Sequence, residues 1–420
     1  MSNAASAGAE RGVKCRFCGE MVQATLVDLG MSPFCQTHIE QHQLNHMEPF
    51  YPLHARVCGR CFLVQLEEYV TPDNIFSEYA YFSSYADSWV EHARKYTEQM
   101  RSRFGISPQS LVMEIASNDG YLLQHFVAAG VPVLGIEPAA NVAQVAQKRG
   151  IRTEVCFHGR DSAHKIAAQY GQADLVLGNN VLAHVPDLND FVAGMKLLLK
   201  PDGIITMEFP HLQRLMEQNQ FDTIYHEHFS YFSFLTASEV FAAHGLMLFD
   251  VEELGTHGGS LRIYARHAQD ASRPITERAT ALRAREIALG FDRLDTYRKF
   301  DEQVKATKRK IMDVLIELKN QGKKIVGYGA PGKGNTLLNY CGIRSDFLDY
   351  TVDRNPYKQG KYTPGTHIPI LAPEAIAATK PDFIFILPWN LRDEITSQLA
   401  YVREWGCKFI VPIPEPKILE

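Results

Sequence analysis

The sequence predicts an α/β protein in which a small cysteine-rich module precedes two Rossmann-like domains. Five of the eight cysteines lie before residue 62, in a stretch with many turn residues and little helical periodicity. From about residue 100, short apolar runs that end in turn residues alternate with amphipathic stretches, which is the pattern of parallel strands joined by helices. The alternation resumes beyond a charged stretch, expected to be helical throughout, from about Pro274 to Gln321. We therefore expect domains at residues 1–75, 76–270 and 271–420.

Each Rossmann-like domain is expected to contain several units of strand, turn and helix. In the middle domain the strand-like runs lie at residues 110–115, 131–138, 173–180 and 203–210. Two further runs, at residues 246–254 and 259–267, are joined through Thr-His-Gly-Gly and predict a hairpin, which a purely parallel sheet would not need. In the last domain the runs lie within residues 323–340, 347–356, 382–390 and 408–416.

The composition excludes several classes of protein. Hydrophobic residues make up 45% of the chain and charged residues 22%, so a core can form and a disordered chain is excluded. A formal net charge of −5 gives no general attraction to phosphate backbones, and we expect no nucleic-acid partner. Since the chain has neither a membrane-spanning apolar run nor a secretory signal, we expect a cytoplasmic protein with reduced cysteines and no membrane partner. We take a monomer as the expected oligomeric state.

Two Cys-x-x-Cys knuckles are the strongest local signal: Cys15 with Cys18, and Cys58 with Cys61. Four thiolates that close a tetrahedron are typical of structural zinc, because a catalytic zinc keeps one position for water. The gap between the knuckles is wider than in common zinc fingers, and Cys35 or His38 could replace one ligand. The alternative interpretation is two unrelated pairs of free thiols.

The turn after the first strand of the middle domain has the position of a nucleotide-binding loop. It reads Glu114-Ile-Ala-Ser-Asn-Asp-Gly120, and the next strand ends at Glu137, where an acid can bind ribose hydroxyls. Ala116 and Asn118 stand where glycines are usual, so an ordinary tight turn with a surface glutamate is the alternative. The third strand ends near the same sheet edge and adds Gly178, Asn179, Asn180 and His184.

The densest ionisable cluster is Tyr225-His226-Glu227-His228, followed by Phe-Ser-Tyr. A His-x-His pair with an acid between is common in metal sites, but no third ligand is near in the sequence. General acid–base chemistry is the favoured interpretation, because imidazole titrates near neutral pH and a phenol can donate a hydrogen bond to a developing oxyanion. An aromatic-rich lid segment remains the alternative.

The last domain opens with a near P-loop, Gly327-Tyr-Gly-Ala-Pro-Gly-Lys333-Gly-Asn335. Gly334 stands where a P-loop needs the Mg²⁺-binding hydroxyl, which argues against an NTPase. Small residues and a lysine at a strand-to-helix turn still predict a cradle for a diphosphate. Asp353, at the end of the following strand, is in the position of the ribose-binding acid, so this domain is either a second nucleotide site or a lost or repurposed one.

The whole chain resembles the zinc-containing sugar C-methyltransferases that act on nucleotide-linked 4-keto deoxyhexoses, most closely the group that methylates C3′ in tetronitrose biosynthesis. The resemblance rests on motifs that occur in the same order: the two Cys-x-x-Cys knuckles, EIASNDGYLL, GIEP, NNVLAHVPD, EFPH, YHEHFSYFS, THGGSLR and GYGAPGKGNTLL. It implies a middle domain of the S-adenosylmethionine-dependent methyltransferase type and a zinc remote from the chemistry. It also implies that the substrate is a dTDP-linked 4-keto, 3-amino deoxyhexose, bound between the middle and C-terminal domains, in deoxysugar and antibiotic biosynthesis.

The resemblance also implies roles for individual residues. His228 would take the proton from C3, Tyr225 would orient the sugar or hydrogen-bond the enolate oxygen, and Glu227 would support them. Substrate contacts are expected from Tyr79, Asn180, His184, Lys333 and Asn335. Cofactor contacts are expected from Glu114, Ala116, Asn118, Gly120, Glu137, Gly178 and Asn179.

Two other functions fit parts of the sequence. A NAD-dependent nucleotide-sugar oxidoreductase would use the same first turn and the same Glu137, but the chain has no reductase-type Tyr-x-x-x-Lys pair near a strand end. A non-enzymatic zinc-dependent binding module would leave the ionisable cluster without a role. Calorimetry with S-adenosylhomocysteine and with NAD separates the three, because the binding module should take neither.

Overall fold

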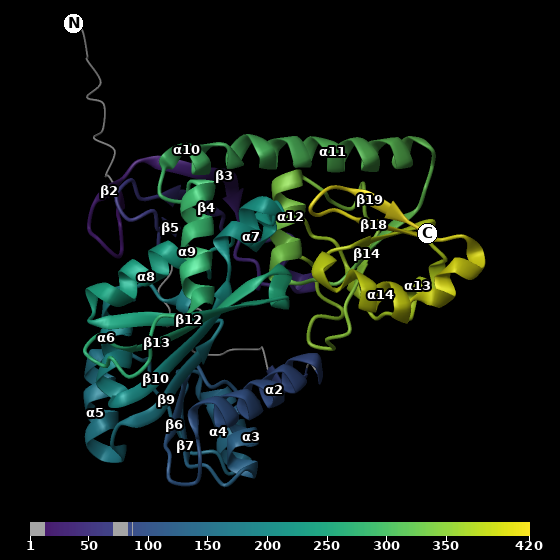
Figure 1. Ribbon diagram of the computed structural model, residues 1–420. Coiled ribbons are helices and arrows are strands. Elements are labelled where there is room, and N and C mark those ends of the chain that lie inside the picture. Colours follow the sequence, from purple (N-terminus) through teal and green to yellow (C-terminus); the bar gives the residue numbers. More distant parts are fainter. Residues whose placement is uncertain (1–12, 70–82, 86) are drawn as a thin grey trace, which may run out of the picture.

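The computed structural model describes residues 13–69, 83–85 and 87–420 and confirms the α/β fold with its N-terminal cysteine module (Figure 1). Tyr79, one of the expected substrate contacts, lies outside the described residues. Among the described helices, none has the length and apolarity that a membrane span requires.

The N-terminal module is a hairpin beside a small antiparallel sheet. The hairpin pairs β1 (Val13–Lys14) with β2 (Met21–Val22), and the sheet contains β3 (Ala24–Ser32), β4 (Tyr51–Val57) and β5 (Val64–Gln65). In β4 every second residue is buried, which is the pattern of a strand with one covered face. A fourth strand, β11 (Ser230–Tyr231), extends this sheet from the middle domain, in the order β11-β5-β4-β3.

The middle domain is a seven-stranded sheet with helices on both faces, in the order β12-β13-β10-β9-β6-β7-β8. Strands such as β6 are buried throughout, as expected for parallel strands covered on both sides. Its strands are β6 (Val112–Ile115), β7 (Val133–Ile136), β8 (Thr153–Glu154), β9 (Ala173–Asn179), β10 (Leu199–Pro210), β12 (Leu246–Leu254) and β13 (Ser260–His267). Its helices are α2 (Asp87–Phe104), α3 (Leu123–Ala128), α4 (Ala140–Lys148), α5 (Arg160–Tyr170), α6 (Leu188–Leu198), α7 (Leu212–Glu217) and α8 (Phe234–Ala243).

The predicted hairpin through Thr-His-Gly-Gly is confirmed. Strands β12 and β13 pair antiparallel, and β13 also pairs antiparallel with β10. The tip needs the left-handed backbone region at three successive residues, where φ is 54° at His257, 91° at Gly258 and 120° at Gly259. Two glycines supply this conformation without strain, whereas the histidine adopts it at a cost.

The connecting segment is helical, but the expectation of one continuous helix is wrong. It consists of α9 (Glu277–Leu289), α10 (Leu294–Arg298) and α11 (Phe300–Asn320). Gly290 ends α9 in the left-handed conformation, with φ of 83°, which a helix cannot continue through. Helix α11 then runs along the molecule from the N-terminal module to the C-terminal domain (Figure 1).

The C-terminal domain is a second, smaller α/β unit. Its sheet has the order β16-β15-β14-β17-β18-β19, parallel except for the last strand. The strands are β14 (Ile325–Tyr328), β15 (Thr351–Val352), β16 (Ile370–Leu371), β17 (Phe383–Ile386), β18 (Lys408–Val411) and β19 (Lys417–Leu419). The helices are α12 (Gly332–Cys341), α13 (Ala375–Thr379) and α14 (Arg392–Gln398).

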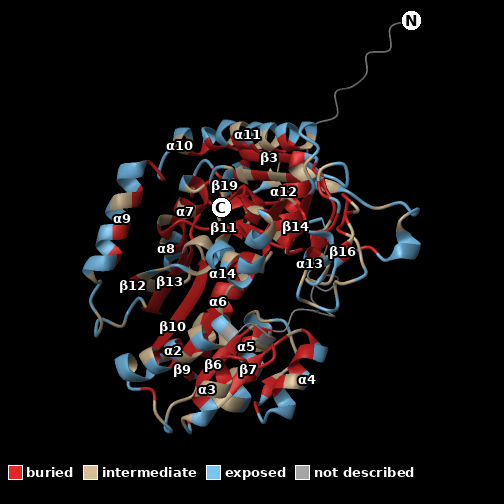
Figure 2. Ribbon diagram, turned by 90° about the vertical axis from the view of Figure 1, so that its right-hand side faces the viewer, coloured by how far each residue is buried: buried red, intermediate tan, exposed pale blue. Residues whose placement is uncertain are grey.

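The N-terminal module shares a core with each of the other domains. Its cysteine knuckles pack into the hydrophobic core of the middle domain. Its sheet packs into a second core together with α11 and the C-terminal domain. In Figure 2 the strands of both large sheets are buried, whereas α9 and α11 expose one side to solvent. The module is therefore a bridge between the two larger domains rather than an appendage.

Candidate active site and zinc centre

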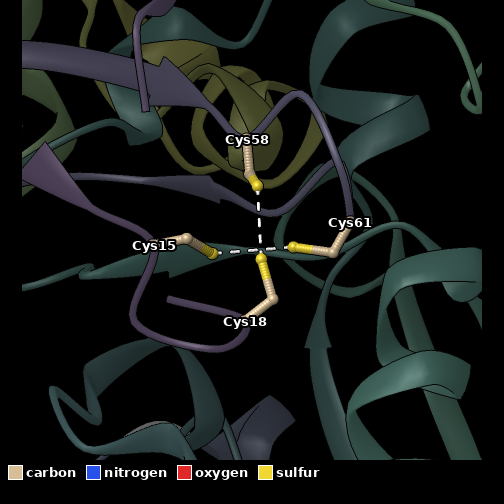
Figure 3. A group of neighbouring side chains, drawn as sticks. All are labelled: Cys15, Cys18, Cys58 and Cys61. Carbon is tan, nitrogen blue, oxygen red and sulfur yellow. Dashed lines mark hydrogen bonds between the residues drawn. The ribbon is translucent and has the colours of Figure 1, made fainter. Parts of the chain in front are cut away.

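The four knuckle cysteines converge on one point (Figure 3). All four sulfur atoms lie within 4.8 Å of one another, with Sγ–Sγ distances of 3.6 Å between Cys15 and Cys61 and 3.5 Å between Cys18 and Cys58. Zn–S bonds of about 2.3 Å in a tetrahedron place the sulfurs about 3.8 Å apart, so the cluster fits zinc. The fifth candidate, Cys35, instead lies with its Sγ 3.7 Å from a Glu227 carboxyl oxygen. Four thiolates complete the coordination, and the metal is structural.

We expect metal analysis of the purified protein to give about one equivalent of zinc per chain. Cys58→Ser should lower the zinc content and the melting temperature together, because metal binding contributes to the folding of such a small module. Cys156→Ser, which removes a partly buried thiol outside the cluster, is the control and should change neither. A protein that binds no zinc would contradict the assignment.

The turn after β6 has the backbone of a glycine-rich loop, although Gly120 is its one glycine. Ala116, Asn118 and Gly120 have φ angles of 58°, 51° and 77°. Ala116 and Asn118, which stand where glycines are usual, thus adopt the conformation that favours glycine. Asn180, at the end of β9, also has a positive φ, of 54°. A non-glycine residue pays about 1–2 kcal/mol for this conformation, and such strain is concentrated at functional sites.

Three buried carboxyl groups meet at this turn: Glu114, Asp119 and Glu137. Glu137 accepts hydrogen bonds from the backbone N–H groups of Asn118 (2.9 Å) and Ala139 (2.8 Å), which fixes the turn against the end of β7. Burial, with Glu137 and Asp119 nearby, raises the pKa of Glu114 well above its usual value. Within the described part of the chain, neither oxygen of the Glu114 carboxyl has a hydrogen-bond partner. An acidic turn with unsatisfied buried oxygens suits a ligand that carries hydroxyls and positive charge.

Packing explains two of the expected cofactor glycines. A Cβ on Gly178 would lie 2.8 Å from the Val181 side chain, and a Cβ on Gly120 would lie 2.3 Å from that of Ile151. Both contacts are made within the domain. Asn179, the last residue of β9, is in register with Glu208 of β10 and lies beside the Tyr121 hydroxyl.

The structure pairs Tyr225 with His228, which lie at the two ends of one turn. The Tyr225 hydroxyl lies 2.8 Å from His228 Nε2, and His228 Nδ1 lies 3.0 Å from the Thr223 carbonyl oxygen. A carbonyl can only accept, so Nδ1 carries the proton and Nε2 accepts from the tyrosine. Burial, with His184, His257 and Lys333 nearby, lowers the pKa of His228 well below its usual value. His228 is therefore a neutral imidazole whose Nε2 lone pair accepts the Tyr225 O–H.

His184 completes this group. Its ring centroid lies 4.7 Å from that of His228, in an edge-to-face arrangement. Burial lowers the pKa of His184 to about 4, so it too is neutral at physiological pH. The two histidines come from different segments, since His184 ends a 3₁₀ turn after β9 and His228 precedes β11.

The neighbours of His228 point toward the N-terminal module. His226 Nε2 lies 3.1 Å from the Pro52 carbonyl oxygen, and the carboxyl of Glu227 faces Cys35 rather than the Tyr225 or His228 side chain. The alternative interpretation, a metal pair of His226 and His228, does not fit, because the two rings face different partners. Burial raises the pKa of Glu227 to about 7.

The raised pKa of Glu227 predicts a measurable pH dependence of stability. Its unfolded pKa is about 4.3, so between pH 4.3 and 7 the folded state holds a proton that the unfolded state has lost, and stability falls as pH rises. Glu227→Gln removes this dependence. We expect the free energy of unfolding of the variant, relative to the parent, to rise by about 3 kcal/mol between pH 4 and pH 8 in denaturant titrations. If the free energy of unfolding changed with pH by the same amount in both proteins, Glu227 would not have a raised pKa.

Lys333 reaches the same region from the C-terminal domain. Its Nζ binds the Asn390 side-chain oxygen and lies 4.7 Å from the centre of the Trp389 ring. Trp389 in turn donates from Nε1 to the buried Asp222 carboxyl, at 2.7 Å. Burial lowers the pKa of Lys333, and Asp222 offsets part of this. A partly buried lysine that retains its charge can attract an anionic ligand.

The nucleotide-like turn of the C-terminal domain is filled by the protein itself. Asp353 accepts from the backbone N–H of Ala330 (2.8 Å), as Glu137 does at the first turn, but Lys358 lies 3.4 Å from the same carboxyl oxygen. The Asn335 side-chain amide donates to the Cys35 carbonyl oxygen, at 2.6 Å. Asn335 is only 1% exposed, and this hydrogen bond links α12 to the N-terminal module, so its role in substrate binding stays a prediction. Residues 35–36 pack against the start of α12, where a Cβ on Gly332 would lie 2.8 Å from Cys35 Sγ and 3.1 Å from Gln36 Nε2.

Sequence reasoning missed several residues of this region. His257, at the hairpin tip, lies with its Nε2 3.3 Å from the Asn180 amide nitrogen and packs edge-to-face against Trp89, at 5.2 Å between ring centroids. The sequence signal for His257 was a histidine before two glycines, a pattern that by itself indicates only a hairpin tip. Trp89, Asp222 and Trp389 gave no sequence signal of this kind.

The parallel sheet with its acidic turn, together with the cysteine module, is typical of an S-adenosylmethionine-dependent methyltransferase with an attached zinc domain. Three family models match successive parts of the chain: a zinc binding domain at residues 15–76, a methyltransferase domain at 89–251 and a C-methyltransferase C-terminal domain at 255–414. The chain is 37% identical over 406 residues to the C-methyltransferase NovU of Streptomyces niveus, covering 97% of this chain and 96% of that protein. The chain therefore belongs to this family of C-methyltransferases.

Two further similarities each cover less than half of the chain. The ubiquinone biosynthesis O-methyltransferase of Bartonella bacilliformis is 26% identical over 108 residues, or 25% of this chain and 44% of that protein. The crystal structure of magnesium protoporphyrin IX methyltransferase from Synechocystis PCC 6803 with bound SAM covers 43% of this chain and 81% of its own, at 15% identity and a TM-score of 0.33. Family membership favours methyl transfer over the oxidoreductase and the non-enzymatic module.

Glu137→Ala should weaken binding of S-adenosylmethionine. A ribose that loses charge-assisted hydrogen bonds to a carboxylate loses about 1.5–3 kcal/mol, or roughly 10–150-fold in affinity. Because Glu137 also holds the turn, Glu137→Gln is the companion variant: it keeps one acceptor oxygen and should lose less. Calorimetry with S-adenosylhomocysteine measures both. Unchanged affinity in Glu137→Ala would place the ribose elsewhere.

Proposed function

We propose that this C-methyltransferase methylates C3′ of a dTDP-linked 4-keto, 3-amino deoxyhexose in deoxysugar biosynthesis. The observation that carries the proposal is the neutral Tyr225–His228 pair beside His184, close to the carboxyl edge of the methyltransferase sheet. A C-methylation needs a carbanion, and a ketone at C4 acidifies the hydrogen on C3. A neutral histidine can accept the C3 proton on its unprotonated nitrogen, which here is Nε2, once that atom gives up its hydrogen bond from Tyr225.

In the proposed reaction His228 takes the C3 proton onto Nε2 as the C3–H bond breaks. The electron pair of that bond moves onto C3 and the C4 oxygen, forming an enolate. Tyr225 donates a hydrogen bond to that oxygen, and the electron pair then returns to C3, which forms its new bond to carbon. S-adenosylmethionine, when bound, would supply the electrophilic methyl group as its bond to sulfur breaks and the sulfur becomes a neutral thioether; Glu114 and Glu137 would hold it, with the residues of the 116–120 turn and Asn179.

The proposed diphosphate position is near Lys333. This lysine is the second residue of α12, and its charge contributes to lowering the pKa of both His228 and His257. Two nearby groups thus respond to one partly buried positive charge, which a dTDP diphosphate would neutralise. Asn180 and His184 at the end of β9 are the proposed contacts to the sugar.

The test is incubation with S-adenosylmethionine and the dTDP-linked 4-keto sugar, followed by NMR of the product. The proposal expects a new methyl group on C3 and no turnover of the matched sugar that carries a hydroxyl at C4, because its C3–H is not acidic. A methyl on oxygen or nitrogen, or equal turnover of the 4-hydroxy sugar, would contradict it. Calorimetry should show binding of S-adenosylhomocysteine but not of NAD.

A further inference from the structure

The segment that carries His228 is held on both sides by backbone hydrogen bonds. On one side, the N–H of Phe229 donates to the Ala183 carbonyl oxygen, at 2.7 Å, next to His184. On the other side, the N–H of Leu66 donates to the Phe229 carbonyl oxygen, at 3.0 Å, and β11 continues this pairing onto β5. The position of the His228 backbone therefore depends on the N-terminal zinc module as well as on the methyltransferase sheet.

Arg16, inside the first zinc knuckle, contacts each of these three segments. One guanidinium nitrogen, Nη2, donates to the Leu66 carbonyl oxygen, and the other, Nη1, donates to the Pro186 carbonyl oxygen, at 3.3 Å, just beyond His184. The guanidinium lies over the Phe229 ring, 5.4 Å from its centroid. The fork of the guanidinium thus joins the strand of the zinc module, the His184 turn and the residue after His228.

The backbone of Arg16 is itself fixed. The residue lies between Cys15 and Cys18, so zinc coordination sets the course of its main chain. The Asn189 side-chain amide donates to the carbonyl oxygens of Arg16 (3.2 Å) and Phe17 (2.9 Å) and anchors the knuckle on helix α6. The N–H of Arg16 and its Nε both donate to the Gln65 side-chain oxygen, at 3.0 Å and 3.3 Å.

We propose that Arg16 is a positioning residue that uses the zinc knuckle to set the placement of His228 relative to His184. This inference rests on the proposed function, since it assumes that His228 is the base. It gives the remote zinc a role in the reaction rate without any chemistry on the metal. Misplacement of a catalytic group by about 1 Å can cost about 10²-fold in rate, so a contact outside the site can control turnover.

The test compares three variants of the full-length zinc protein. Arg16→Met keeps the apolar stem but removes every guanidinium contact; Arg16→Lys keeps the charge but cannot donate in a fork to two carbonyls. Arg60→Met is the matched control, because Arg60 lies in the second knuckle, between Cys58 and Cys61, with its side chain exposed. Each variant is measured for zinc content, S-adenosylhomocysteine affinity, KM for the sugar, kcat, and the rate of C3 deuterium exchange without methyl donor.

The inference expects Arg16→Met to lower kcat and C3 exchange together by about 10–100-fold, with zinc content, cofactor affinity and KM within about twofold of the parent. Arg16→Lys should recover part of the loss, and Arg60→Met should match the parent. Parent-like kcat and exchange in Arg16→Met would overturn the inference. So would a loss of zinc and of affinity for both ligands in step with kcat, because Arg16 would then only maintain the fold. If Arg16→Met does not fold, Arg16→Lys is judged by the same criteria.

The result for His228→Asn separates this inference from the proposed function. If His228→Asn exchanges C3 hydrogen at the parent rate, the proposed base is wrong and the positioning role of Arg16 fails with it. If His228→Asn stops exchange while Arg16→Met and Arg16→Lys exchange at the parent rate, the base stands and the inference about Arg16 alone is overturned.

Discussion

His228→Asn should lower turnover by about 10²–10⁴-fold while both ligands stay bound. That range is the usual contribution of general-base assistance. An amide keeps the approximate shape of the imidazole and can still hydrogen-bond the Thr223 carbonyl, which now receives Nδ1–H at 3.0 Å. It cannot accept the C3 proton at neutral pH, so the chemical step is lost and binding is not. Steady-state kinetics and calorimetry with S-adenosylhomocysteine measure the two effects.

The matched control for this prediction is His226→Asn. His226 lies two residues away, but its Nε2 binds the Pro52 carbonyl oxygen of the N-terminal module, at 3.1 Å. We expect its turnover to remain within a few-fold of the parent. Equal losses in the two variants would show that the whole segment, rather than the His228 imidazole, is what the substitutions disturb.

Tyr225→Phe should lower turnover by about 10²–10³-fold, the usual cost of losing one donor to an oxyanion. In the structure the Tyr225 hydroxyl donates to His228 Nε2, at 2.8 Å. When Nε2 takes up a proton, the direction of this hydrogen bond reverses, and the tyrosine O–H becomes free to donate to the enolate oxygen. One hydrogen bond thus links His228, the proposed base, to Tyr225, which stabilises the enolate that proton removal forms.

A double variant tests that link. If Tyr225 and His228 act as a unit, Tyr225→Phe combined with His228→Asn should be little slower than His228→Asn alone. If the loss of turnover in the double variant equals the product of the two single losses, the two side chains act independently. Unchanged turnover in Tyr225→Phe would remove the tyrosine from the reaction and leave the enolate oxygen to another donor.

The fold was largely predictable because its signals are local. The apolar runs that became β6, β7, β9 and β10 end in turn residues, and two glycines mark the β12–β13 hairpin. The break at Gly290 was missed because a single glycine in a charged, helical pattern does not by itself end a helix. The insertion of β11 into the sheet of the N-terminal module was not predictable, since the two partners are far apart in the sequence.

The candidate site was predictable only where the residues that contact each other are close together in the sequence. The four cysteines follow from two knuckles, and Tyr225 and His228 belong to one cluster, although their spacing left open whether Tyr225 or His226 lies beside His228. The roles of Cys35 and Asn335 did not follow, because a contact 300 residues apart brings them together. His257 and Trp389 reach the site through a hairpin tip and another domain, and such placements come from tertiary packing rather than from local pattern.

Solvent deuterium exchange at C3, followed by NMR in the absence of methyl donor, tests the central claim most directly, because it isolates proton removal from methyl transfer. We expect the parent and Glu137→Ala, with its weakened cofactor site, to exchange the C3 hydrogen of the dTDP-linked 4-keto sugar at similar rates, whereas His228→Asn should not exchange it. Exchange by His228→Asn at the parent rate would show that His228 is not the base, and His184 or Tyr79 would then be the next candidate.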